Sequence, residues 1–277
     1  MLAGVLANEG ADLSAHETLE RAQRHTEDFS VLAAEYETLA RAAQQQRWDD
    51  LLDRSGLEPQ HLEQVRQSPA YGPLLAALRH AEAHGLDVEQ TFPRLVAVRP
   101  LDDAEDPAAV LRDRVDRWAQ VAGSSRRASP NLIAGLIPRA VGLTDPDMAR
   151  GLEERDEAMQ HRARALAERA IEQNQVWVRR LGGPPPDRVA RERWIEAVTT
   201  VAAYRERWNI GDDHRPLGSK VTARTIEAIN QRNLAQAAVN RASRLTYPRG
   251  AQYPELLAVA VDISPAGRPG LQDERSI

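Results

Sequence analysis

The chain has 277 residues, a formal net charge of −5 and 42% hydrophobic residues, so it is long enough to bury one or two hydrophobic cores. It contains no cysteine, which excludes disulfide bonds, a thiolate nucleophile and cysteine-ligated zinc. No apolar run approaches the roughly 18 residues that a membrane span needs, so we expect a cytoplasmic protein with no membrane span.

Charge is divided unevenly along the chain. Residues 1–125 carry a net charge of −10 and residues 126–277 a net charge of +5. An acidic first half followed by a basic second half suggests two regions with different partners. We therefore expect the following organisation: an acidic helical region over 1–121, a hinge at 122–130, a second helical region over 131–245 and an irregular or disordered tail over 246–277.

The composition is typical of helices, because aromatic residues make up only 4% of the chain and Ala, Leu, Arg, Glu and Gln are abundant. No stretch shows the apolar alternation and turn signals of a strand. Capping residues precede a proline at four places: Ser68-Pro69, Asp106-Pro107, Ser129-Pro130 and Asp145-Pro146. These patterns predict an all-α, multi-helical fold with helices near 2–9, 15–27, 30–54, 59–66, 69–84, 88–97, 107–121, 131–140, 146–181, 187–209 and 220–244.

The segment LGGPPPDRVARERW, residues 181–194, interrupts two long helical patterns. Gly182 or Gly183 can end a helix, because glycine adopts positive φ without a Cβ penalty. The three prolines that follow prevent the helix from continuing, and Asp187 is a good N-cap for the next one. The sequence therefore predicts a long antiparallel helical hairpin over residues 146–209.

Three tryptophans belong to this hairpin, namely Trp177, Trp194 and Trp208. If their rings are buried, they form the core of the hairpin, with Trp177 near Trp194. If they are exposed together, they form an apolar patch suited to a protein partner. Asn174 lies within the same apolar stripe, where it either fixes the register of the pair or sits at the solvent edge.

The sequence contains no recognisable catalytic or metal-binding motif. Lys220 is the only lysine, and its context PLGSKVTART lacks the spacing of a P-loop, so ATP hydrolysis is not expected. His80 and His84 lie four apart on a predicted helix, but Ala81 stands where a zincin has its glutamate. We expect both histidines to face solvent near a helix end, where positive charge is favourable. No catalytic residue, metal site or cofactor is predicted.

The basic segment 219–249 is the one group of residues with a plausible ligand. It holds six basic residues against Glu227 alone. Its candidate phosphate contacts are Lys220, Arg224, Arg232, Arg241 and Arg244. Tyr247 is its only aromatic residue, so the interleaved aromatics of a single-strand platform are missing. The segment fits either a nucleic-acid contact or a solvated or protein-binding helix.

The stretch WVRRLGGPPPDRVARERWIEAVTTVAAYRERWNIGDDHRPLG, residues 177–218, resembles the C-terminal region of actinobacterial MobF-type conjugative relaxase-helicases, the TrwC/TraI-like proteins of plasmid transfer. The opening LAGVLANEGADLSAHETLERAQ is similar to the segment that follows the helicase core in such proteins. In that family a relaxase domain nicks the transfer origin and a helicase domain unwinds the plasmid, but neither set of motifs occurs here.

The resemblance implies a non-catalytic docking or regulatory module. Its partners would be proteins of the conjugative transfer apparatus, such as the relaxosome or the coupling protein of a type IV secretion channel. The alternative is a helical nucleic-acid-binding domain that contacts DNA through residues 219–249.

Overall fold

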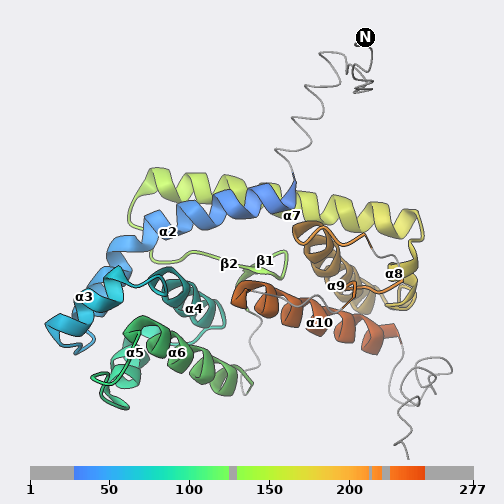
Figure 1. Cartoon of the computed structure of the whole chain (residues 1–277). Coiled ribbons are helices and arrows are strands. Elements are labelled where there is room, and N and C mark those ends of the chain that lie inside the picture. The colour runs from blue at the N-terminus through green and yellow to red at the C-terminus, as the bar shows by residue number, and fades with distance from the viewer. Residues whose placement is uncertain (1–27, 125–129, 212–213, 220–224, 247–277) are drawn as a thin grey trace, which may run out of the picture.

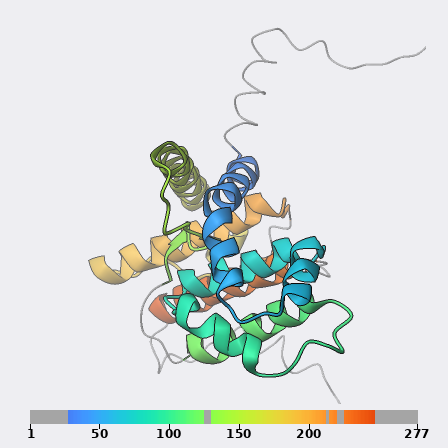
Figure 2. The ribbon, with the colours of Figure 1, turned by 90° about the vertical axis from the view of Figure 1, so that its left-hand side faces the viewer.

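The computed structural model describes residues 28–124, 130–211, 214–219 and 225–246 (Figures 1 and 2). The predicted helices at 2–9 and 15–27 and nearly all of the predicted tail lie outside these residues, as does most of the predicted hinge. The elements in chain order are α2 (Phe29–Asp53), α3 (Pro59–Gln67), α4 (Tyr71–Ala83), α5 (Val88–Ala97), α6 (Pro107–Ser124), β1 (Leu132–Ile133), β2 (Ile137–Pro138), α7 (Pro146–Glu172), α8 (Val176–Arg179), α9 (Arg188–Arg207) and α10 (Ile226–Thr246). The described chain is thus mostly helical, as predicted, with one small hairpin.

Two hydrophobic cores organise these elements. The larger core joins the first half of α2 to the β-hairpin and to α7, α8, α9 and α10, and Phe29 and Tyr36 are the α2 side chains at its centre. The smaller core lies among α3, α4, α5 and α6, and Trp48 and Leu52 bring the last turns of α2 into it. In Figure 1, α2 runs beside α7 along the top and reaches the α3–α6 group at its far end. One helix therefore ties both cores together.

Three helix starts follow the predicted capping pattern, whereas α4 begins at Tyr71, after Ser68-Pro69, and no helix begins at Pro130. The Asp145 side chain accepts hydrogen bonds from the first backbone N–H groups of α7, and Asp106 accepts one from Ala109 at the start of α6. The Asp187 side chain accepts one from the Ala190 N–H at 2.8 Å, which begins α9 directly after the prolines. Each cap satisfies donors that a helix N-terminus would otherwise leave without partners.

The prediction of a helix at 131–140, and of no strand anywhere, was wrong. Leu132–Ile133 pairs antiparallel with Ile137–Pro138, and Leu136 donates its N–H to the Ile133 carbonyl across the turn. Ala134 and Gly135 both have positive φ, 47° and 73°, which is the backbone of the hairpin-closing type I′ turn. The hairpin is pinned from outside: the Tyr36 hydroxyl accepts the Ala140 N–H at 2.8 Å. Tertiary contacts thus override the helical pattern here.

The predicted helix 146–181 is interrupted near its end. α7 stops at Glu172, Asn174 takes a φ of 48°, and the short α8 follows. Asparagine tolerates this left-handed conformation better than most residues, so the polar residue in the apolar stripe marks a break in the helix. Beyond the break, α8 and α9 pack closely as the predicted helical hairpin. α9 also packs against α7 and α10.

Candidate functional site

The tryptophans of the hairpin belong to the larger core. Trp177 is 2% exposed and Trp194 is 1% exposed, so neither offers its ring to a partner. The Trp177 Nε1 donates to the Gln175 side chain at 2.5 Å, whereas the buried Trp194 Nε1 has no hydrogen-bond partner among the described residues. Trp208 is half-buried, and its Nε1 donates to Gln231 on α10 at 3.0 Å. The exposed-patch interpretation of these rings is therefore wrong.

Arg205 organises the loop after α9 from inside the protein. Its guanidinium donates to the carbonyls of Ile210, Arg215 and Pro216 at 3.1–3.2 Å and lies over the Trp177 ring, 5.0 Å from the ring centroid. The planar fork of arginine suits several acceptors at once, and the aromatic face adds a cation–π attraction. Arg205 is thus a buried anchor for the loop that ends in Pro216-Leu217-Gly218.

The GGPPP link is fixed to the end of α10. Gly182 has a φ of +87°, as expected for the residue that closes a helix. The Thr246 hydroxyl donates to the Gly183 carbonyl at 2.9 Å, and a Cβ on Gly182 would approach Thr246 to within 2.6 Å. The turn within the stretch that carries the resemblance is therefore held against the end of α10.

The basic segment is only partly available to a ligand. Arg232 donates to the Leu217 carbonyl at 2.9 Å and contacts the Tyr204 hydroxyl, so its guanidinium is engaged by groups of the chain itself. Arg241 and Arg244 are exposed on α10. Lys220 and Arg224 lie outside the described residues. The structure therefore brings together two of the five predicted contacts.

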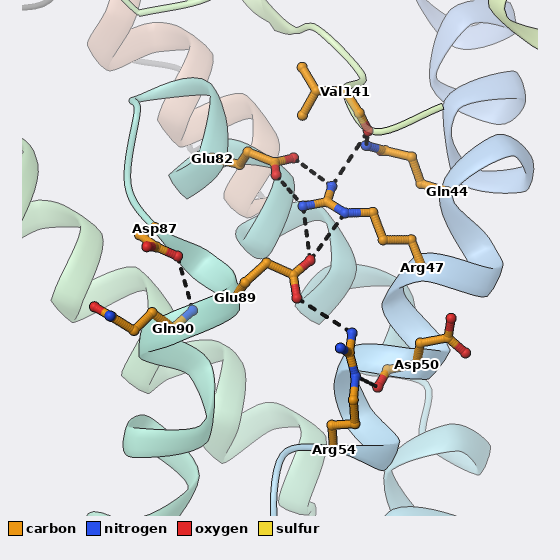
Figure 3. A network of polar contacts seen from close by, with 9 residues as sticks. All are labelled: Gln44, Arg47, Asp50, Arg54, Glu82, Asp87, Glu89, Gln90 and Val141. Carbon is orange, nitrogen blue, oxygen red and sulfur yellow. Dashed lines mark hydrogen bonds and ion pairs between the residues drawn. The ribbon is translucent and has the colours of Figure 1, made fainter. Parts of the chain in front are cut away.

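A second arginine network holds α2 against α4 and α5 (Figure 3). Arg47 on α2 donates to both carboxylate oxygens of Glu82 and to Glu89, and the bond to Glu82 raises the pKa of Arg47. The buried amide of Gln44 donates to the Val141 carbonyl at 2.8 Å. Glu82 is two residues from both His80 and His84 on α4, so the turn of the helix directs its side chain away from theirs. We interpret this network as a structural clamp, since each cation in it faces a carboxylate or carbonyl.

A cavity lined by several ionisable groups lies between α2, α4, α6, the β-hairpin and α10, and we call it the interhelical pocket. Its volume is about 450 Å³. Its apolar wall consists of Pro73, Ala76, Ala77, Leu136, Pro138 and Leu234. Its charged wall consists of Glu37, Arg41, Arg79, Arg112, Asp116 and Glu227, with His80 among them. An apolar cavity with a few charged groups is the usual form of a small-molecule site.

The carboxylates and the arginines of the interhelical pocket differ in their close partners. Glu37 and Glu227 both bind Arg207, at 3.3 and 2.8 Å. Burial raises the pKa of Glu37, and the neighbouring Glu227 adds to this rise against the attraction of Arg207. Burial likewise raises the pKa of Asp116. Glu37 and Glu227 are thus shared with Arg207, burial makes Glu37 and Asp116 less readily ionised, and Glu37 also attracts Arg79.

The histidine pair corrects another expectation. His80 and His84 are half-buried, their ring centroids are 4.4 Å apart, and His80 lines the interhelical pocket. Burial, reinforced by repulsion from His84, lowers the pKa of His80 to about 4. His80 is therefore neutral at pH 7, and the expected benefit of positive charge at this helix end does not apply to it.

One group of ligand-type side chains was missed at the sequence level. Glu58, His61 and Asp102 place one potential ligand atom each within 4.8 Å of the others. Their distance in the sequence conceals this proximity, because the loop before α6 brings Asp102 to the start of α3. Glu58 and Asp102 are exposed, and His61 lies 3.8 Å from Asp102, so the three form a surface ion-pair cluster.

Comparisons of the chain with protein-family models, with curated proteins and with solved structures find no match. Among the described residues, no helix is both long enough and apolar enough to cross a membrane.

Proposed function

We propose that the chain is a non-catalytic docking module of a conjugative DNA-transfer relaxase-helicase. Its partner would be a protein of the transfer apparatus, in the relaxosome or at the coupling protein. The resemblance over residues 177–218 supports this family, and the residues that carry it form the buried frame of Trp177, Trp194 and Arg205. Because these residues hold helices together, we expect the chain to bind a partner protein through a helical surface and not to catalyse a reaction.

The observation that carries the proposal is the outward face of α10. Ala235, Ala238 and Ala242 bury the inner face of the helix in the larger core. The exposed polar side chains of its last turns are Asn233, Gln236, Asn240, Arg241 and Arg244. Neither of these arginines has an ion-pair partner within the described part of the chain. Amides and unpaired guanidinium groups on a fixed helix provide hydrogen bonds and charge complementarity for an acidic protein surface.

Two features favour a protein partner over DNA. Arg232 is committed to the Leu217 carbonyl, so α10 presents only two adjacent cations to a ligand. A DNA site gains its affinity from many phosphate contacts, and a single-strand site adds exposed aromatic rings. Trp208 of the hairpin is half-buried, and its Nε1 donates to Gln231 on α10.

A co-purification experiment tests the proposal. The tagged chain is expressed from its own plasmid in donor cells, and the transfer proteins that co-purify are quantified by mass spectrometry. Arg241→Glu with Arg244→Glu should deplete them, because like charges facing each other weaken association strongly. Arg94→Glu with Arg99→Glu, an equal charge change at exposed positions outside α10, should not. Equal recovery from the two double variants would contradict docking through α10.

A DNA titration distinguishes the docking function from the alternative, a nucleic-acid-binding domain. The purified chain is titrated with single-stranded and duplex oligonucleotides at low and physiological salt. We expect no binding even at low salt. Binding that weakens steeply with salt would instead support the nucleic-acid-binding interpretation of residues 219–249.

A further inference from the structure

Two arginines of the interhelical pocket form no close ion pair or hydrogen bond with a described residue, although Glu37 attracts Arg79 from a longer distance. Arg41 on α2 and Arg79 on α4 both line the pocket, and their mutual repulsion contributes to lowering the pKa of Arg79. Within the described part of the chain, neither guanidinium has a carboxylate within 4.0 Å or a hydrogen-bond acceptor. Arg79 is also largely removed from solvent, and burial is the main cause of its lowered pKa. Two like charges beside one cavity, one of them desolvated, form an arrangement that a bound anion would stabilise.

A third arginine completes the charged wall. The Nε of Arg112 on α6 is buried and donates no hydrogen bond within the described residues; its nearest acid, Asp116, is 3.9 Å away. Buried donors nearly always have a partner, so an unsatisfied one at a cavity wall indicates a missing acceptor. Glu37 and Glu227 bind Arg207, and Asp116 stays beyond hydrogen-bond distance of the Arg112 Nε.

The apolar lining residues of the pocket set the character of the rest of the ligand. Pro73, Ala76, Leu136 and Leu234 present carbon atoms to the cavity, and the volume of about 450 Å³ lies in the range of small-molecule sites. Guanidinium groups match the paired oxygens of phosphate and carboxylate groups. We propose that the interhelical pocket binds a small organic oxyanion, with its phosphate or carboxylate group at Arg41 and Arg79 and its apolar body against Ala76, Leu136 and Leu234. This site is separate from the outward face of α10 and does not depend on the docking proposal.

Isothermal titration calorimetry on the full chain tests the site with three probes: phenyl phosphate, benzoate and inorganic phosphate. Phenyl phosphate or benzoate should bind saturably and more tightly than inorganic phosphate, because only the organic probes contact the apolar wall. The tighter of the two organic probes identifies the head group. Arg79→Gln should weaken this binding about tenfold or more, as expected for the loss of a charge-assisted hydrogen bond. Arg94→Gln, an exposed arginine outside the pocket, should leave it unchanged.

Two further variants keep the test decisive if Arg79→Gln is unstable. Arg41→Gln removes an exposed charge at the pocket rim and should weaken binding in a chain with unchanged circular dichroism. Ala76→Phe fills the cavity from an exposed position without changing charge, and it should weaken phenyl phosphate more than inorganic phosphate. The proposal is overturned if neither organic probe binds at about 10 mM, a concentration at which a site with a millimolar Kd would be nearly saturated. It is also overturned if Arg41→Gln, Arg79→Gln and Arg94→Gln all bind equally.

Discussion

Gly135 at the turn of the β-hairpin offers the sharpest test of the fold. Its φ is +73°, and a Cβ placed there would lie 2.4 Å from the Oγ1 of Thr200 and 3.0 Å from its Cγ2. Gly135→Ala therefore combines about 1–2 kcal/mol for a left-handed alanine with about 1–3 kcal/mol for overpacking against α9. We expect a total loss of about 2–5 kcal/mol in the free energy of unfolding, which is a large share of the stability of a domain.

A double-mutant cycle separates the two causes. Thr200→Ala removes the overlapping atoms and alone should cost about 1–2 kcal/mol, because it deletes one largely buried methyl group and a hydroxyl that donates to the Glu196 carbonyl. In the double variant the overpacking should vanish while the backbone strain remains, so the two substitutions should couple by about 1–3 kcal/mol. Gly183→Ala is the control, since nothing lies within 4 Å of its Cβ position and its φ is not positive.

Urea unfolding followed by circular dichroism measures all four variants. Gly183→Ala should stay within about 1 kcal/mol of the parent chain. The reasoning is refuted if Gly135→Ala costs no more than this control, or if Thr200→Ala fails to relieve any of its cost.

Further predictions concern the core, pH and catalysis. Trp177→Ala and Trp194→Ala should each cost about 3–5 kcal/mol, and acrylamide should quench neither ring freely in single-tryptophan variants; free quenching of both would refute their burial. The pKa of His80 is about 4 in the folded chain, whereas an unfolded histidine titrates near 6.5. As the pH falls from about 6.5 to 4, the parent chain should therefore lose up to about 3 kcal/mol of stability relative to His80→Gln. An NMR titration midpoint of His80 near 6.5 would contradict this. Arg205→Lys should cost about 1.5–3 kcal/mol in urea unfolding, because an ammonium group cannot reach three carbonyls; an unchanged midpoint would argue against the anchor. The purified chain should neither hydrolyse ATP nor nick DNA with magnesium, and turnover above a heat-killed control would overturn the non-catalytic proposal.

Much of the fold follows from local sequence signals. Proline after an acidic cap located the starts of α6 and α7, and Gly182 with Asp187 defined the turn into α9. These signals work because they act within one helical turn and depend little on the rest of the chain. The helix-dominated composition correctly predicted the fold class.

The β-hairpin could not be predicted in the same way. Residues 131–140 are rich in leucine, isoleucine and alanine, and Ala134 is an unusual residue for positive φ. The hairpin exists because Ile133, Leu136 and Ile137 are fully buried between elements far away in the sequence. A short apolar run gives no periodicity that separates strand from helix.

The interhelical pocket could not be predicted from the sequence either. Arg41, Arg79 and Arg112 lie on three helices spread over more than seventy residues, and only packing brings them to one cavity. His80 was expected at the surface because its helix end is near, yet α10 and the hairpin enclose that side. Charge counts predicted the basic segment, but they could not show that Arg232 would turn inward to the Leu217 carbonyl.

A mating assay tests the central claim most directly. Donor cells carry the conjugative plasmid to which the docking proposal assigns the chain, with Arg241→Glu and Arg244→Glu or with the control pair Arg94→Glu and Arg99→Glu. If α10 docks a transfer protein, plasmid transfer to recipients should fall about tenfold or more in the first variant and stay at the parent level in the second, at equal protein abundance. Parent-level transfer from the α10 variant, or an equal fall in both, would contradict the docking function.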